Sequence, residues 1–271
     1  MSGGLMMRNM YVRIVFAMIL VLTVLFSTAA LSETAQPEEN FTYSVLNGTY
    51  CSVTGYTGAD TEVVIPEVLG GYIVQQIGGS AFKGKTAITS VTLPDSVETI
   101  SGNAFEGCTG LVSFEGGSGL VTLGGSAFIG CTSLKEVTFA EGLTSIGGSA
   151  FQNCTGLETI TLPDSLGTIN GYVFSGCTNL TEVKFGEGLK TIYAYAFQNC
   201  TGLEELELPD SITTMSGRAF YNCTKLSSVN YPKSWVNTPD YYRNSTTYYS
   251  EYDSNYRSPF EGCSSLKEMA I

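Results

Sequence analysis

The sequence predicts a mainly β solenoid, and two periodic patterns are the basis of this prediction. A phenylalanine recurs every 23 residues through seven copies without insertion or deletion, at Phe82, Phe105, Phe128, Phe151, Phe174, Phe197 and Phe220. With the single exception of Gly116, aliphatic or aromatic residues follow each phenylalanine by 6, 9, 11 and 15 positions, as at Leu157, Ile160, Leu162 and Leu166. A unit this short cannot bury its apolar side alone, so the copies are expected to stack on one another.

Each copy is expected to contribute one short strand to a long parallel sheet. The residues 9 and 11 positions after the phenylalanine alternate with polar ones, which is typical of a strand with one buried face. Proline then ends the strand in three copies, because it has no amide hydrogen to donate. The polar side of the sheet is predicted to be hydroxyl-rich and acidic, without aromatic residues. It comprises Ser90/Thr92, Ser113/Glu115, Glu136/Thr138, Thr159/Thr161, Glu182/Lys184, Glu205/Glu207 and Ser228/Asn230.

A recurring motif points to a known family. Residues 104–111 read Ala-Phe-Glu-Gly-Cys-Thr-Gly-Leu, and the copies keep the form Ala-Phe-x-Gly/Asn-Cys-Thr-x-Leu together with Leu-Pro-Asp-Ser. From about residue 41 to residue 271 the chain resembles the BspA-like leucine-rich repeat family of surface proteins. The resemblance implies a leucine-rich repeat array in an exported microbial protein with a non-enzymatic binding role, in several relatives linked to adhesion. It implies no particular ligand and assigns no functional residue.

Residues 1–32 are predicted to be a secretory signal peptide. Arg8 and Arg13 precede an apolar run over residues 14–26, and mostly small residues follow. A basic start, an apolar core and small residues at the cleavage site are the features of such a leader. The alternative is an uncleaved anchor, although the core is shorter than the ~20 apolar residues that span a bilayer. A cleaved leader predicts a secreted or cell-surface protein whose mature chain does not insert into the membrane.

Residues 33–40 are polar and predict a short flexible lead-in, and residues 41–76 predict an N-terminal cap with a partial repeat. Two alternating stretches, at 41–45 and 49–53, flank Asn47-Gly48, a pair typical of β-hairpin turns. A hairpin at this place would cover the apolar residues and strand edges that the end of a solenoid otherwise exposes.

Residues 77–236 predict seven leucine-rich repeats in one domain, since no linker or change of composition separates the copies. The first copies are irregular: Lys85 replaces the usual cysteine, and Gly116 replaces the usual leucine or phenylalanine. Terminal repeats of solenoids are commonly atypical in this way.

Residues 237–257 interrupt the pattern with a Tyr-rich insertion, because Phe260 follows Phe220 by 40 residues instead of 23. Tyrosine supplies a large, rigid contact area with a hydroxyl, and insertions in repeat proteins often form binding loops. The candidate ligand-binding residues are therefore Tyr241, Tyr242, Tyr248, Tyr249, Tyr252 and the only tryptophan, Trp235. The alternative is a solvated loop, or a segment that packs back on the last coils.

Residues 258–271 predict a final partial repeat, in which Phe260 and Cys263 keep their usual offset. Two interpretations of this end remain open. Either the insertion and the last strand close the solenoid, or the reading frame is truncated.

Seven of the eight cysteines, from Cys108 to Cys263, keep one position of the repeat, and they are predicted to be buried free thiols that fill a tight turn. Equivalent residues in adjacent coils are ~4.8 Å apart with parallel side chains, whereas a disulfide needs Cβ atoms ~3.8 Å apart that point together. Thiolates in a line do not form the tetrahedral set that zinc requires.

Catalysis is not expected, and neither is a metal or cofactor site. The chain contains no histidine, which removes the Ser-His-Asp and Cys-His arrangements and every histidine-metal site. The carboxylate pair Glu205 and Glu207 would be solvated on an open sheet. The Gly-Gly pairs recur with the repeat, so they serve its turns and not a phosphate.

The charge balance disfavours nucleic acid and anionic membranes as partners. Removal of the leader leaves 11 basic residues against 25 acidic ones, a formal charge of −14. Phosphate recognition needs clustered lysine and arginine. An acidic balance is also ordinary for a soluble exported domain.

Two functional hypotheses follow. The first is an exported, adhesin-like protein that binds a protein or glycan partner at a cell surface or in a host environment, through the solenoid surface and the Tyr-rich insertion. The second is a structural envelope or matrix component that self-associates and has no discrete ligand.

Overall fold

The structure is a computed structural model, and it describes residues 36–230, 232 and 258–267. The chain divides into a unit of residues Met1–Ala35 and a unit of residues Gln36–Ile271, and every described residue belongs to the second. The predicted signal peptide, the Tyr-rich insertion and Trp235 lie outside the described residues. Within the described ranges, no helix is long and apolar enough to cross a membrane.

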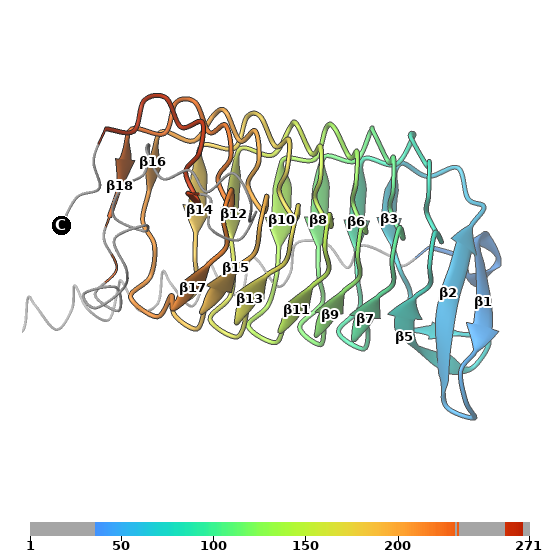
Figure 1. The fold of residues 1–271 in the computed structure, drawn as a ribbon. Coiled ribbons are helices and arrows are strands. Elements are labelled where there is room, and N and C mark those ends of the chain that lie inside the picture. The colour runs from blue at the N-terminus through green and yellow to red at the C-terminus, as the bar shows by residue number, and fades with distance from the viewer. Residues whose placement is uncertain (1–35, 231, 233–257, 268–271) are drawn as a thin grey trace, which may run out of the picture. The chain divides into compact units, whose positions relative to one another are not determined.

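The repeats form a β solenoid in which each full coil contributes two short strands, so that two parallel ladders run along the array (Figure 1). The first ladder consists of β3 (Glu62–Val64), β6 (Ser90–Thr92), β8 (Ser113–Glu115), β10 (Glu136–Thr138), β12 (Thr159–Thr161), β14 (Glu182–Lys184), β16 (Glu205–Leu206) and β18 (Ser228–Val229). The second consists of β5 (Tyr72–Ile77), β7 (Thr99–Ile100), β9 (Thr122–Leu123), β11 (Ser145–Ile146), β13 (Thr168–Ile169), β15 (Thr191–Ile192) and β17 (Thr214–Met215).

The mainly β solenoid is confirmed, but the expectation of one strand per copy is wrong. The second ladder pairs equivalent residues of successive coils, such as Thr99 with Thr122, and is interrupted between β11 and β13. Most of its strands are only two residues long. Two residues are too few to show the alternation of apolar and polar side chains that predicts a strand, so the sequence pattern does not reveal this ladder.

The first ladder is interrupted twice, and both interruptions follow a phenylalanine. Its strands fall into the sheets β10-β8-β6-β3, β12-β14 and β16-β18. Where the ladder continues, the amide after a strand donates to the next coil, as from Leu162 to Lys184 O at 2.8 Å. After β10 and β14 the corresponding residues are Phe139 and Phe185, whose larger rings are only partly buried. We attribute the breaks to the bulk of these rings.

A stack of buried phenylalanines forms the centre of the core. The rings of successive coils lie 4.8 to 5.5 Å apart between centroids, from Phe82 to Phe220. The stack continues across the insertion, because Phe260 lies 5.4 Å from Phe220. Such ring pairs contribute roughly 0.5–1.5 kcal/mol each beyond area burial.

The glycine or asparagine of the repeat motif is explained by its backbone conformation. The position has φ between 57° and 82° in all eight coils, at Gly84, Gly107, Gly130, Asn153, Gly176, Asn199, Asn222 and Gly262. Glycine adopts this left-handed region freely, and asparagine tolerates it better than most residues.

The cysteines are free and buried, as predicted. In the array each thiol donates a hydrogen bond to the carbonyl oxygen of a phenylalanine in the preceding coil, at 3.0 to 3.2 Å. The thiols therefore satisfy the backbone of the turn that they fill.

The predicted hairpin cap is confirmed. Strands β1 (Phe41–Val45) and β2 (Tyr50–Tyr56) pair antiparallel, β2 adds to the second ladder beside β5, and β4 (Val68–Leu69) pairs with the other side of β5. Tyr56 lies 5.9 Å from Phe82, so it extends the ring stack into the cap. The turn differs from a two-residue Asn-Gly turn: Asn47 Oδ1 accepts from the amides of Thr49 and Tyr50, and Gly48 does not adopt positive φ.

The described part of the predicted flexible lead-in is tied to the cap by hydrogen bonds. The amide of Gln36 donates to Val64 O at 3.1 Å. A single 3-10 turn, η1 (Glu38–Asn40), follows, and the Glu38 carboxylate accepts from the amide of Gly70 at 3.0 Å. These contacts hold residues 36–40 against the first strands.

Candidate functional site

The six residues singled out as candidate ligand contacts lie outside the described residues and stay predictions. They are Tyr241, Tyr242, Tyr248, Tyr249, Tyr252 and Trp235. The last described strand before these residues is β18, which belongs to the first ladder, and Asn230 directly follows it. Two surfaces of the described array have the geometry of a binding site.

The first surface is an acidic groove of about 790 Å³ over β14, β16 and the break between them. The bulk of Phe185, which we hold responsible for the break, therefore also accounts for the hollow. Its lining is Thr181, Glu182, Val183, Lys184, Phe185, Glu187, Glu204, Glu205, Glu207, Leu208, Pro209 and Asn230.

The outward residues of β14 and β16 point to solvent, as the alternation predicts. Glu182, Lys184 and Glu205 are exposed, whereas Val183 and Leu206 between them are buried. The sequence thus identifies the acidic face correctly. It does not reveal the hollow, which depends on how far two neighbouring coils are apart.

The groove carries a net negative charge, with five glutamates against one lysine in its lining. Lys184 lies 3.4 Å from Glu182, and Lys225, outside the lining, lies 3.7 Å from Glu204. Both pairs are well exposed, so they offset little of the field. The groove is therefore suited to a positively charged group of a partner.

Asn230 closes the C-terminal end of the groove, where its side chain takes the place of a backbone partner. Its Nδ2 donates to Leu208 O at 2.8 Å, and its Oδ1 accepts from the Leu208 amide at 2.6 Å. One side chain thus satisfies both backbone groups of Leu208, and fixes the groove wall at this point.

The thiols are poor candidates for nucleophilic chemistry. Burial raises the pKa of Cys108 to about 11, and it raises the pKa of Cys131 and Cys154 further. A thiol of raised pKa is not the nucleophilic thiolate at neutral pH. Among the described residues, no group of three or more histidine, cysteine, aspartate or glutamate side chains could hold a metal ion.

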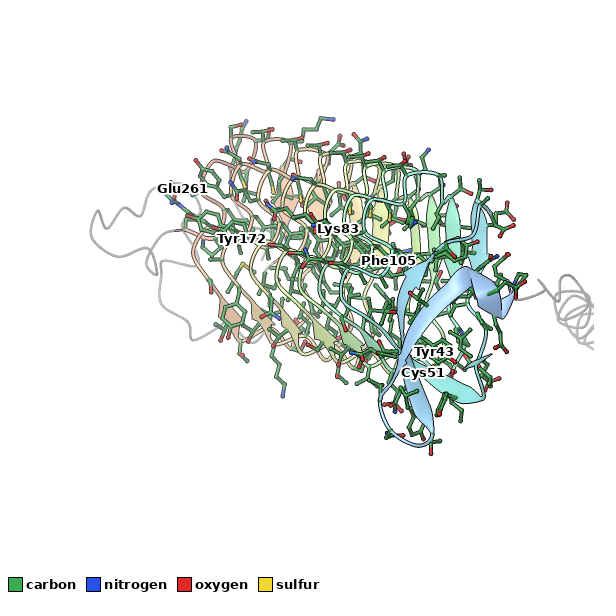
Figure 2. The ribbon with its side chains drawn as sticks, turned by 90° about the vertical axis from the view of Figure 1, so that its right-hand side faces the viewer. Tyr43, Cys51, Lys83, Phe105, Tyr172 and Glu261 are labelled. Carbon is green, nitrogen blue, oxygen red and sulfur yellow. The ribbon has the colours of Figure 1, made fainter. Side chains whose placement is uncertain are left out.

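The second surface is a cluster of tyrosines around Arg218, which we call the tyrosine stack: Tyr172, Tyr195, Tyr221, Arg218 and Glu261. The rings of Tyr172 and Tyr195 lie 5.1 Å apart and 10° from parallel. The Arg218 guanidinium lies 5.8 Å from the Tyr195 ring and 5.3 Å from the Tyr221 ring. Figure 2 shows Tyr172 at the surface, toward the end of the array that carries Glu261.

Arg218 ties the tyrosine stack to the last described coil. Its Nε and Nη2 donate to the two carboxylate oxygens of Glu261 at 2.8 and 3.1 Å, and its Nη1 donates to the Tyr195 hydroxyl at 2.7 Å. These bonds raise the pKa of Arg218 above its usual value, so that it stays charged. The ion pair spans the insertion, since Glu261 follows Arg218 by 43 residues.

Sequence reasoning missed the tyrosine stack, although the repeat carries a signal for it. Tyr172, Tyr195 and Arg218 occupy one repeat position, which holds small polar residues in the four coils before them: Ser80, Asn103, Ser126 and Ser149. Comparison of the copies column by column would have shown the change from small polar to large side chains.

Comparison with known proteins places the chain among leucine-rich repeat proteins. A family model described as "BspA type Leucine rich repeat region (6 copies)" matches residues 61–180 and 144–248. A leucine-rich repeat protein of T. pallidum is 31% identical, with a TM-score of 0.68 over 71% of this chain and 91% of that protein. A leucine-rich cell surface protein of Faecalibacterium prausnitzii is 28% identical, with a TM-score of 0.65 over 74% of this chain and 55% of that protein. No curated protein matches the sequence.

Proposed function

Because the chain belongs to the BspA-type leucine-rich repeat family, we propose that it is an exported, non-catalytic binding protein whose acidic groove receives a basic segment of a protein partner. The observation that carries this proposal is the excess of glutamate in a hollow of about 790 Å³ on the first ladder. Carboxylates around a concave surface attract cationic groups and orient them during encounter.

Export is supported by two separate observations. Residues 1–32 have the three features of a secretory leader. The similar protein of Faecalibacterium prausnitzii is described as a cell surface protein, and this chain spans about half of its length. The place of action that we propose is therefore the cell surface or its surroundings.

The Tyr-rich insertion is proposed as the second contact with the same partner. It begins seven residues after Asn230, which closes the groove. Replacement of Tyr241, Tyr242, Tyr248 and Tyr249 by serine should weaken binding about tenfold or more and leave the melting temperature nearly unchanged. Unchanged affinity would remove the insertion from the proposed site.

The groove is tested by titrating the mature chain with a fluorescent Lys/Arg-rich decapeptide at low and physiological salt. The double variant Glu205→Gln/Glu207→Gln should bind about tenfold more weakly. The matched control Glu115→Gln/Glu136→Gln removes the same charge from the same ladder outside the groove, and should bind nearly as wild type. Equal loss in both pairs would indicate a general charge effect, and would contradict a site in the groove.

Self-association remains a second candidate, and the edge strand β1 favours it. Tyr43, Val45 and the adjacent Leu46 are 38 to 49% exposed on this strand and its turn. An apolar strand edge is a template for pairing with another chain. Light scattering over a range of protein concentrations tests self-association. Oligomers that grow with concentration, and that the variant Val45→Lys does not form, would support this candidate. A monomer at every concentration would exclude it.

A further inference from the structure

The tyrosine stack is held in a backbone conformation that large side chains avoid. Tyr172, Tyr195 and Arg218 have φ of 61°, 61° and 62°. For residues other than glycine and asparagine this region costs roughly 1 kcal/mol or more each. The same position accepts serine or asparagine in four other coils, so the turn itself does not require tyrosine or arginine. The large side chains therefore have a use beyond the turn.

The stack is rigid at one end and open at the other. Tyr195 is fixed by the hydrogen bond from Arg218, by the Arg218–Glu261 ion pair behind it, and by an edge contact with Tyr221 at 6.2 Å. One face of Tyr172 rests on Tyr195. The next position along the column is Ser149, whose short side chain leaves the other face of Tyr172 without an aromatic neighbour among the described residues.

The open end combines a ring face with uncharged polar groups. Tyr172, at this end, is 42% exposed. The preceding coil contributes Ser149, Gln152 and Asn153, which are half-buried or exposed. An amphipathic ring next to a coil that carries hydroxyl and carboxamide side chains suits a ligand that has one apolar face and a rim of hydroxyl groups.

We propose that Tyr172 is the stacking platform of a glycan-binding site, on which the C–H face of a pyranose ring lies while Ser149, Gln152 and Asn153 bind its hydroxyls. The site uses none of the residues that line the acidic groove, so it goes beyond the proposed function and stands or fails separately from it. Because Arg218 and Glu261 immobilise the stack before binding, little rotamer entropy is lost on Tyr172.

The test is calorimetric titration of the mature chain with soluble hexasaccharides of β-1,4-glucose, β-1,4-N-acetylglucosamine, α-mannose and β-galactose. At least one is expected to bind, and Tyr172→Asn should weaken that binding about tenfold or more. Asparagine tolerates positive φ, so this variant should keep or raise the melting temperature. Val121→Ala, which removes an apolar side chain of similar exposure (40%) outside the stack, is the control and should bind as wild type.

Two results would overturn the glycan site. One is that none of the four saccharides binds, and the other is that Tyr172→Asn binds as tightly as the wild type. A proline-rich peptide that binds through Tyr172 in place of every saccharide would also contradict a glycan ligand. The basic decapeptide should bind Tyr172→Asn and the wild type equally, which separates failure of this site from failure of the groove.

Discussion

Each cysteine of the array has two roles, as a small apolar filler and as a hydrogen-bond donor to a phenylalanine carbonyl of the preceding coil. The sequence predicts the first role, because coil spacing excludes disulfides. The second role could not be foreseen, since it depends on where one carbonyl points. In the described part of the chain, no buried side-chain nitrogen or oxygen lacks a hydrogen-bond partner.

The buried thiols should make stability depend on alkaline pH. Cys108 has its pKa raised from 9.0 to about 11 by burial. The folded state thus holds this proton more tightly than the unfolded state. The contribution of this thiol to the free energy of unfolding is complete below pH 9 and is lost as the pH rises from 9 toward 11. The loss is up to ~1.4 kcal/mol for each pH unit and each such thiol.

Urea unfolding at pH 8, 9 and 10 checks this dependence. Tyrosine and lysine titrate in the same range, so the control is Cys131→Ala/Cys154→Ala/Cys177→Ala, whose free energy of unfolding should fall less steeply. An identical slope in the variant would contradict the assignment to thiols. Native thiols should also resist labelling until the chain unfolds.

The Arg218–Glu261 ion pair should be coupled in energy, because both side chains are about one-fifth exposed and share two hydrogen bonds. Removal of one partner leaves a poorly solvated charge, which costs ~2 kcal/mol. A double-mutant cycle with Arg218→Asn and Glu261→Gln measures the coupling, and asparagine avoids new strain at positive φ. Additive losses would show that the pair does not stabilise the last coil.

At the scale of elements, the sequence predicts the first ladder, its outward face and the hairpin cap, because each rests on local alternation. It predicts neither the second ladder, whose strands are too short, nor the two breaks of the first. The breaks depend on how phenylalanine packs where leucine stands in other copies. Phe139 and Phe185 form edge contacts with core rings, at 6.1 and 5.9 Å, instead of being buried fully.

Phe185→Leu is expected to repair the ladder and close the groove. The smaller side chain should let the amide of residue 185 donate to Glu207 O, as Leu162 donates to Lys184 O. Slower hydrogen exchange at that amide and weaker binding of the basic decapeptide should follow. Phe139→Leu is the matched control: it should repair the other break and leave peptide binding unchanged. Exchange rates that do not change would contradict the role of ring size.

At the scale of the molecule, the array is a repetition of nearest-neighbour contacts, and its two candidate surfaces arise where the repetition is broken. The acidic groove lies at a break in the first ladder, and the tyrosine stack lies where a column of small residues becomes large. The sequence predicts the period and the core because every coil repeats them. It predicts the surfaces poorly because each depends on the relation between two or three particular coils.

If a basic partner binds the first ladder at the acidic groove, hydrogen exchange of the mature chain should change there when the Lys/Arg-rich decapeptide is added. The added protection should concentrate in residues 181–187 and 204–208, around the groove. Protection that falls on the second ladder, or is spread evenly over all coils, would contradict binding at the groove.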